Sequence, residues 1–135
     1  MTNEAVLIYE TSIPIPFTVA DGTGIEKGAI LKMTDPMTAS LAVAKEDIIA
    51  GIAASEKIAS DGKTKLGVYR SGIFKVLASG NITVGDALIT SAVTTGNTVE
   101  TAGVSGEDIV GIALETATDG QTLLMELKPF SMNLA

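Results

Sequence analysis

Short apolar runs separated by polar turns make up most of the chain. The runs are rich in Val, Ile, Leu and Thr, and they end at pairs such as Asp-Gly, Ser-Gly and Gly-Asn. This pattern predicts β-strands, because β-branched side chains fit a pleated sheet and Gly, Asp and Asn accept turn geometry. Helical periodicity is not sustained, and even the alanine-containing stretch Thr38–Asp47 is not favoured as a helix. The predicted strands are Ala5–Tyr9, Ile15–Ala20, Ala29–Met33, Ser40–Val43, Ile49–Lys57, Lys65–Arg70, Ile73–Leu77, Ala87–Thr90, Thr98–Thr101, Ile109–Thr116 and Thr122–Lys128.

One turn signal predicts a particular pairing. Ser71-Gly72 lies between the strand-like runs LGVYR and IFKV. A two-residue Ser-Gly connection between apolar runs is typical of a tight hairpin. We therefore expect the strands on either side of Ser71-Gly72 to pair with each other.

The sequence also contains an internal repeat. Ile25–Leu31 matches Ile82–Leu88, and Glu46–Ala53 matches Glu107–Ala113 apart from one extra alanine in the first copy. The matched segments lie about 60 residues apart, as expected for a duplicated structural unit. Each copy places a glycine inside an apolar strand, which predicts a bulge or a close approach of another backbone.

This repeat sets the expected domain organisation. We predict a single all-β domain over residues 21–135, with half-repeats at about 21–79 and 80–130. Two copies of one β unit favour a pseudo-symmetric barrel or sandwich.

The first twenty residues stand outside the repeat and are predicted to form an extended N-terminal arm. Pro14 and Pro16 lack an N–H and push the residues before them into extended geometry, so the arm can pair along one edge only. Its apolar side chains still favour burial, either on a neighbouring subunit or as a first strand on its own barrel. The candidate partner interface of the arm is Ile13, Pro14, Ile15, Pro16 and Phe17.

The C-terminal tail is a second candidate contact. It is short and apolar in character. The tail residues that could pack on a partner are Phe130, Met132 and Leu134.

Composition excludes most catalytic chemistry. The 135 residues include no His and no Cys, so imidazole bases, thiolate nucleophiles, disulfides and zinc fingers are excluded. The net charge is −7 and Arg70 is the one arginine, which argues against binding to nucleic acid. No apolar run reaches the roughly 20 residues of a membrane helix. The acidic start has no signal-peptide character, so we expect synthesis in the cytoplasm.

The remaining chemical signals are weak. The acid pairs Glu46-Asp47 and Glu107-Asp108 are adjacent residues in matched turns, which favours turn formation over a catalytic carboxylate pair. The acidic chain could hold Ca²⁺ or Mg²⁺ loosely, but it has no calcium-loop motif. Lys57, Lys63 and Lys65 are interleaved with acids, so we interpret them as a solvated loop. We predict no catalytic, metal or cofactor site.

The order of motifs resembles the capsid decoration (cement, head-stabilising) proteins of tailed bacteriophages. The resemblance runs from the arm through GIEKGAIL, EDIIAGIA, GVYRSGIFKV, ITVGDALIT and EDIVGIALETA to TLLMELKP, roughly residues 10–129. It implies a β-tulip or β-barrel-like subunit that is not an enzyme and binds no cofactor. It also implies a homotrimer on the capsid exterior, with the major capsid protein as partner.

Two other classes stay open at this point. One is another β-structured virion protein, such as a tail, spike or fibre domain. The other is a carbohydrate-binding module, although the chain has no Trp and only five Tyr and Phe residues to stack on sugars.

Overall fold

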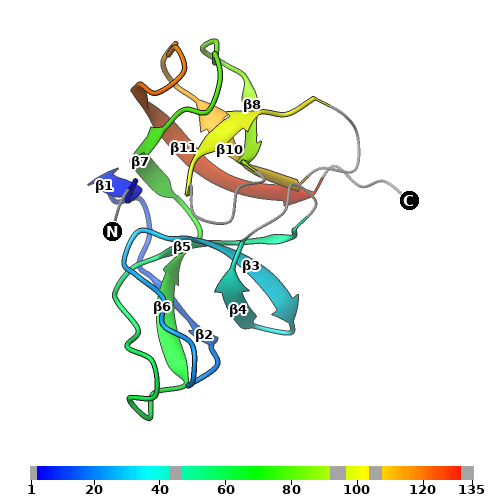
Figure 1. Ribbon diagram of the computed structural model, residues 1–135. Coiled ribbons are helices and arrows are strands. Elements are labelled where there is room, and N and C mark those ends of the chain that lie inside the picture. The colour runs from blue at the N-terminus through cyan, green and yellow to red at the C-terminus, as the bar shows by residue number, and fades with distance from the viewer. Residues whose placement is uncertain (1–2, 43–46, 92–96, 104–107, 132–135) are drawn as a thin grey trace.

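The computed structural model describes residues 3–42, 47–91, 97–103 and 108–131, and every regular element in these ranges is a strand (Figure 1). The predicted all-β class is therefore confirmed. Each predicted strand overlaps an observed one, and Thr38 begins a strand, not a helix. The strands are β1 Val6–Tyr9, β2 Ile15–Thr18, β3 Ile30–Asp35, β4 Thr38–Leu41, β5 Ile49–Ala53, β6 Lys65–Tyr69, β7 Gly72–Leu77, β8 Ala87–Thr90, β9 Val99–Thr101, β10 Asp108–Ala113 and β11 Thr122–Ser131.

Five of these strands form a closed barrel. The order around it is β2-β4-β3-β5-β6, and β6 returns to β2 by antiparallel pairing of Ile15–Thr18 with Lys65–Val68. The barrel closes between β2 and β4, which run parallel and meet at Thr18 and Thr38. Apart from this single pairing at Thr18, β2 is joined to the barrel through β6.

The other strands form a six-stranded sheet in the order β1-β7-β11-β10-β8-β9. Figure 1 shows this sheet above the barrel. If β1 is set aside, the order β7-β11-β10-β8-β9 parallels the barrel order β2-β6-β5-β3-β4. A parallel bridge between Ala78 and Val99 joins the end of β7 to β9, where the barrel joins β2 to β4.

Two apolar cores hold the fold together. The barrel core contains Phe17, Leu31 and Val68, which are almost completely buried. The second core lies under the six-stranded sheet and also takes in Ile30 and Ile52 of the barrel strands. Because one cluster draws on strands of both sheets, the barrel and the sheet share a packed boundary.

The glycines predicted to allow close backbone approach do so in both sheets. A Cβ on Gly51 would lie 2.0 Å from the Tyr69 carbonyl oxygen, and a Cβ on Gly111 would lie 2.2 Å from the Glu126 carbonyl oxygen. Gly51 also has φ +147°, where side chains are strained. These positions tolerate no side chain without movement of the neighbouring strand.

The predicted Ser71-Gly72 hairpin is wrong. β6 pairs with β5 and β2 in the barrel, whereas β7 pairs with β1 and β11 in the six-stranded sheet. Gly72 has φ +135°, and the chain turns there from one sheet into the other. The turn was predicted correctly, but the turn residues carry no information about which sheet the next strand joins.

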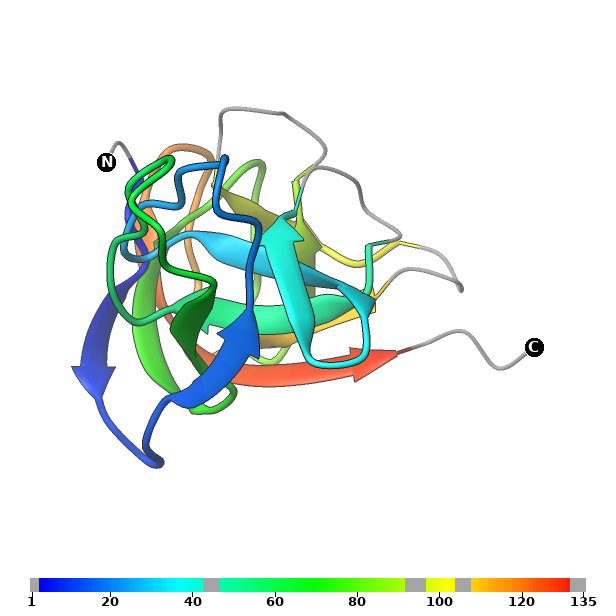
Figure 2. The same ribbon diagram turned by 90° about the horizontal axis from the view of Figure 1, so that it is seen from below.

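The N-terminal arm does not project from the fold as an arm. β1 pairs with β7, and β2 is a strand of the barrel, so the segment contributes to both sheets. The connection between the two strands forms a protruding corner, visible at the lower left of Figure 2. Here the alternative of a first strand on its own barrel describes β2 correctly.

Candidate functional site

No group of three or more His, Cys, Asp or Glu side chains that could hold a metal ion occurs in the part of the chain that the structure describes. Within the same residues no helix is long and apolar enough to cross a membrane. Of the two acid pairs, Glu46 and Glu107 lie outside the described residues. The candidate sites are therefore surfaces.

The first surface is the protruding corner between β1 and β2. Ile13 is 77% exposed, and large apolar side chains on either side of it also reach the solvent. Ten residues of chain, Val6–Ile15, thus expose several large apolar side chains, which makes this segment a candidate interaction surface. The exposed apolar residues here are Val6, Ile8, Tyr9, Ile13 and Ile15.

The prolines act as the sequence predicts. Over Ile15–Phe17, β2 pairs on one side only, with β6, and its pairing with β4 begins at Thr18, beyond Pro16. Phe17 points inward and is only 2% exposed, so its ring supports the barrel core. Pro14 is half-buried and Pro16 is exposed. The outward part of the predicted interface is therefore Ile13–Pro16, with Phe17 beneath it.

Side chains fasten this corner to the turn between the two sheets. The Thr11 hydroxyl donates to Ser71 Oγ at 2.9 Å, and Ser12 Oγ lies 2.7 Å from the same atom. The Tyr69 hydroxyl donates to Glu10 Oε2 at 3.1 Å. Burial and the neighbouring Glu10 carboxylate raise the pKa of Tyr69, which keeps the phenol protonated as a donor. These hydrogen bonds connect the corner to the turn between β6 and β7.

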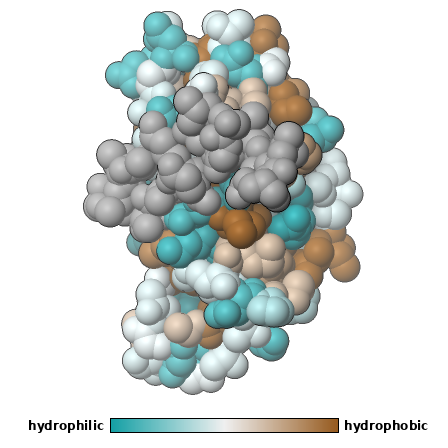
Figure 3. Space-filling view, turned by 90° about the vertical axis from the view of Figure 1, so that its right-hand side faces the viewer, coloured by the Kyte–Doolittle hydropathy of each residue, from teal (hydrophilic) through white to brown (hydrophobic). Residues whose placement is uncertain are grey.

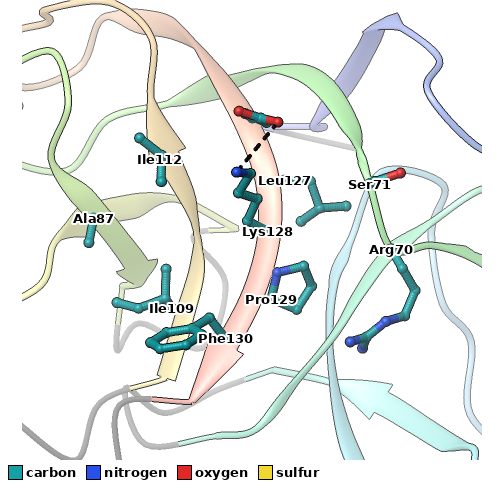
Figure 4. Close-up of a pocket in the computed structure, with 10 residues that line it drawn as sticks. Arg70, Ser71, Ala87, Ile109, Ile112, Leu127, Lys128, Pro129 and Phe130 are labelled. Atoms are coloured by element: carbon teal, nitrogen blue, oxygen red, sulfur yellow. Dashed lines mark ion pairs between the residues drawn. The ribbon is translucent and has the colours of Figure 1, made fainter.

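The second surface is an open groove of about 660 Å³ on the outer side of β10 and β11 (Figure 4). Its lining is mostly apolar, with Ser71 at one rim. Lys128 Nζ lies 4.0 Å from Glu126 Oε2 within it. The lining residues are Arg70, Ser71, Ala87, Ile109, Ile112, Glu126, Leu127, Lys128, Pro129 and Phe130.

Of the three tail residues predicted to contact a partner, Phe130 lines this groove. Its ring is 63% exposed at one end of the groove. Met132 and Leu134 lie outside the described residues. Figure 3 shows apolar surface gathered about the middle of the molecule on one side, and a mainly polar or neutral barrel end below it.

One charged residue contradicts the sequence interpretation. Lys57, predicted to be part of a solvated loop, is only 2% exposed. Its Nζ lies 2.7 Å from Asp61 Oδ1 and 3.1 Å from Asp21 Oδ1. Burial lowers its pKa, but the hydrogen bonds to Asp61 and Asp21 outweigh that effect, so the pKa of Lys57 is raised. The hydrogen bond from Lys57 lowers the pKa of Asp61. This cluster joins the loop that contains Asp21 to the loop that contains Lys57 and Asp61 at the barrel end.

Sequence reasoning missed the groove because its residues are far apart along the chain. Arg70, Ala87 and Phe130 meet only through the order of strands in the sheet. The available signal was weak: Leu124, Glu126, Lys128 and Phe130 alternate with buried residues along β11. Such alternation predicts an outer face but not a concave one.

The described residues thus form an all-β fold whose candidate sites are two exposed apolar surfaces. The phage cement protein family matches residues 9–128, so the chain belongs to that family and is a phage virion capsid protein. Cement proteins bind the capsid and are not enzymes, which confirms the exclusion of catalysis.

A solved structure shares the fold. It is the N base of the head fibre gp8.5 of bacteriophage phi29, with a TM-score of 0.56 and 21% sequence identity. The alignment covers 88% of this chain and 98% of that one. No curated protein matches the sequence.

Proposed function

We propose that the protein binds the outer surface of an assembled phage capsid and stabilises the shell as a trimer that bridges neighbouring capsomers. Membership of the cement family over residues 9–128 carries this proposal. The net charge of −7 supports an exterior position, because an acidic chain is repelled by packaged DNA. The exposed apolar surfaces support assembly into a trimer, since such surfaces are costly to leave in water.

The mechanism is mass action. A protein that binds the assembled shell and not its free subunits stabilises the shell by the free energy of binding. Many symmetric copies on one shell add avidity, because each trimer that bridges capsomers links subunits that would otherwise separate. No covalent step is needed, which fits a chain without His or Cys.

The protruding corner is the proposed anchor. Ile13 and Ile15 provide apolar contact, and Pro14 and Pro16 hold the segment extended, so little conformational entropy is lost on binding. Phe17 fixes the base of the corner from inside the barrel. Phe130 and, with it, the tail residues Met132 and Leu134 form a proposed second contact.

The two halves of the chain are also proposed to be similar structural units. We infer a tulip-like subunit of two similar β units with boundaries near residue 80. Matched hydrogen bonds support it: Ile25 and Lys57 exchange backbone bonds at 2.8 and 2.7 Å, and Ile82 and Ala117 do so at 2.8 and 2.9 Å.

Point substitutions test the anchor better than deletion. Removing residues 1–20 would take β2 out of the barrel, so loss of binding would report unfolding. Ile13→Ser and Ile15→Ser change only outward side chains. Burial of an isoleucine stabilises by about 1.5–3 kcal/mol, so each variant should bind shells about tenfold more weakly or worse.

The measurement is co-sedimentation with capsids that lack the protein, over a range of concentrations. Ile58→Ser is the matched control, because Ile58 is 62% exposed at the barrel end. Unchanged thermal unfolding shows that each variant is folded. Full binding by both corner variants would refute the anchor, and failure of the unaltered protein to sediment with shells would refute the function.

A further inference from the structure

The groove on the outer side of β10 and β11 adjoins a smaller cavity of about 100 Å³. Arg70, Pro129 and Phe130 line both of them, and Figure 4 shows Arg70 and Phe130 on opposite sides of the groove. The smaller cavity is also lined by Met33 of β3 and Ile49 of β5. It therefore lies at the boundary between the barrel and the six-stranded sheet.

The small cavity contains a buried carboxylate. Asp108, at the start of β10, is only 3% exposed, and no described residue donates a hydrogen bond to its carboxylate. A buried acceptor without a donor is costly. The cavity is several times larger than the roughly 10–15 Å³ that one water needs, so it has room for a group that would supply the donor.

Arg70 gives the same cavity the opposite chemistry. Its Nη1 donates to the Ile49 and Ala50 carbonyls at 3.3 and 2.9 Å, which fixes the guanidinium and leaves Nη2 and Nε as donors. A guest that contacts both side chains meets an acceptor at Asp108 and donors at Arg70. A carboxamide offers an N–H and a C=O together and is neutral, whereas Arg70 would repel a lysine and Asp108 would repel a carboxylate. The cavity therefore suits the side chain of Asn or Gln.

The larger groove selects its occupant by shape and not by charge. Lys128 Nζ lies 4.0 Å from Glu126 Oε2, so these two charges offset each other, and most of the other lining is apolar. Ser71 at the rim is hydrogen-bonded to Thr11 and Ser12 of the protruding corner. Because that corner is the proposed shell anchor, a capsid subunit that contacts the anchor also lies beside the groove.

We propose that the groove and the adjoining cavity receive an extended apolar segment of the major capsid protein, whose Asn or Gln side chain donates to Asp108 and accepts from Arg70. This inference rests on the proposed function and deepens it, since it names the chemistry of the capsid surface that is recognised. Binding supplies the donor that the described residues do not give Asp108, so Asp108 acts in recognition and not in folding.

Asp108→Asn separates these two roles. The substitution keeps the shape but removes the charge that strengthens the hydrogen bond from the capsid, so binding to shells should weaken about tenfold. Thermal unfolding of the free protein should stay unchanged or move to higher temperature, because a buried charge without a donor is removed. Asp47→Asn is the matched control: Asp47 is the equivalent acid of the first repeat copy and lines neither cavity. Unchanged shell binding by Asp108→Asn, an equal loss in Asp47→Asn, or a lower unfolding temperature for Asp108→Asn would overturn the inference.

Photo-cross-linking identifies the occupant, because the chain has no Cys of its own. Lys128→Cys at the groove and Lys63→Cys on an exposed barrel-end loop are each labelled with a cysteine-specific benzophenone, bound to shells and irradiated. Mass spectrometry should find the Lys128→Cys product on an apolar segment of the capsid protein that contains Asn or Gln, and little product with Lys63→Cys. Cross-linking to a second copy of this chain, or to a capsid segment with Lys or Arg in place of the carboxamide, would overturn the inference. If the unaltered protein does not sediment with shells, the proposed function fails; if it sediments but neither test gives the expected result, only this inference fails.

Discussion

The barrel and the six-stranded sheet follow the same strand order, but they differ at the edge strands and on the outer face. In the barrel, β2 and β4 meet at Thr18 and Thr38 and close the structure. In the sheet, β1 adds to the side of β7, and the outer face of β10 and β11 stays open as a groove. One strand order thus gives a closed barrel in one place and, in the other, a sheet that is extended by β1 and carries an open groove on its outer face.

The two regions also differ at one matched buried position. Lys57 in the barrel exchanges backbone hydrogen bonds with Ile25, and Ala117 does the same with Ile82 in the sheet. The barrel thus holds an ion-pair cluster where the sheet holds a methyl group. The loops at the barrel end are joined by an ion-pair cluster, whereas the corresponding loops of the sheet are joined by hydrogen bonds of Asp119 without a lysine.

The largest predicted effect is a loss of folding stability when alanine replaces either of the two glycines that permit close strand approach. In Gly51→Ala the new Cβ clashes with the Tyr69 carbonyl, and the backbone φ of this position is unfavourable for a side chain. In Gly111→Ala the new Cβ clashes with the Glu126 carbonyl and the Met125 side chain, without that backbone strain. We expect losses of about 4 and about 2 kcal/mol, since overpacking and backbone strain add in the barrel. Chemical denaturation measures both free energies of unfolding.

Gly22→Ala is the control for this pair, because a Cβ there would meet nothing within 4 Å. Its free energy of unfolding should stay within about 0.5 kcal/mol of the unaltered protein. Equal losses for Gly51→Ala and Gly111→Ala would contradict the difference between barrel and sheet.

The next effect concerns the junction of the two regions. Asn97, just before β9, accepts a hydrogen bond from the Ile30 amide at 2.8 Å and donates to the Asn3 and Gly28 carbonyls at 2.8 and 2.9 Å. Asn97→Ala removes these three hydrogen bonds and takes the acceptor away from the buried Ile30 amide, so it should cost about 2 kcal/mol.

Urea unfolding followed by separate probes in each region checks this prediction. Asn97→Asp keeps the acceptor for the Ile30 amide and should lose less than Asn97→Ala. If Asn97→Ala leaves both the midpoint and the slope of unfolding unchanged, the side chain does not couple the barrel to the sheet.

The smallest effect is the pH dependence of the barrel end. Because the hydrogen bond from Lys57 lowers the pKa of Asp61 below its usual 3.8, its contribution to stability is present above that pH. The contribution should disappear as the pH falls below 3.8 through the lower value of the folded state. The stability difference between the unaltered protein and Asp61→Asn should therefore shrink between pH 4 and more acidic conditions.

Asp119→Asn is the matched substitution in the other region, where the carboxylate accepts a hydrogen bond from the Gly80 amide and not from a lysine. It controls for the loss of a turn hydrogen bond. A stability difference for Asp61→Asn that stays constant from pH 7 into strong acid would show that the ion pair contributes nothing.

The sequence predicted local structure well and long-range placement poorly. The strands could be predicted because alternation and turn residues such as Asp61-Gly62 act within a few positions. The hairpin prediction at Ser71-Gly72 was wrong because turn residues do not specify which strand the next strand pairs with. The interpretation of Lys57 was wrong because one of its two carboxylate partners, Asp21, lies 36 residues away, so the local sequence did not show that the side chain is enclosed. The one-sided pairing of β2 could be predicted from Pro14 and Pro16, since proline lacks the N–H that a second strand would need.

The most direct test of the account measures the capsid itself. Shells lacking the protein are heated with increasing amounts of it, and their disruption temperature and bound protein are recorded together. The account predicts that the disruption temperature rises with occupancy and levels off at a fixed number of copies per shell, in multiples of three. An unchanged disruption temperature at saturating protein would contradict it.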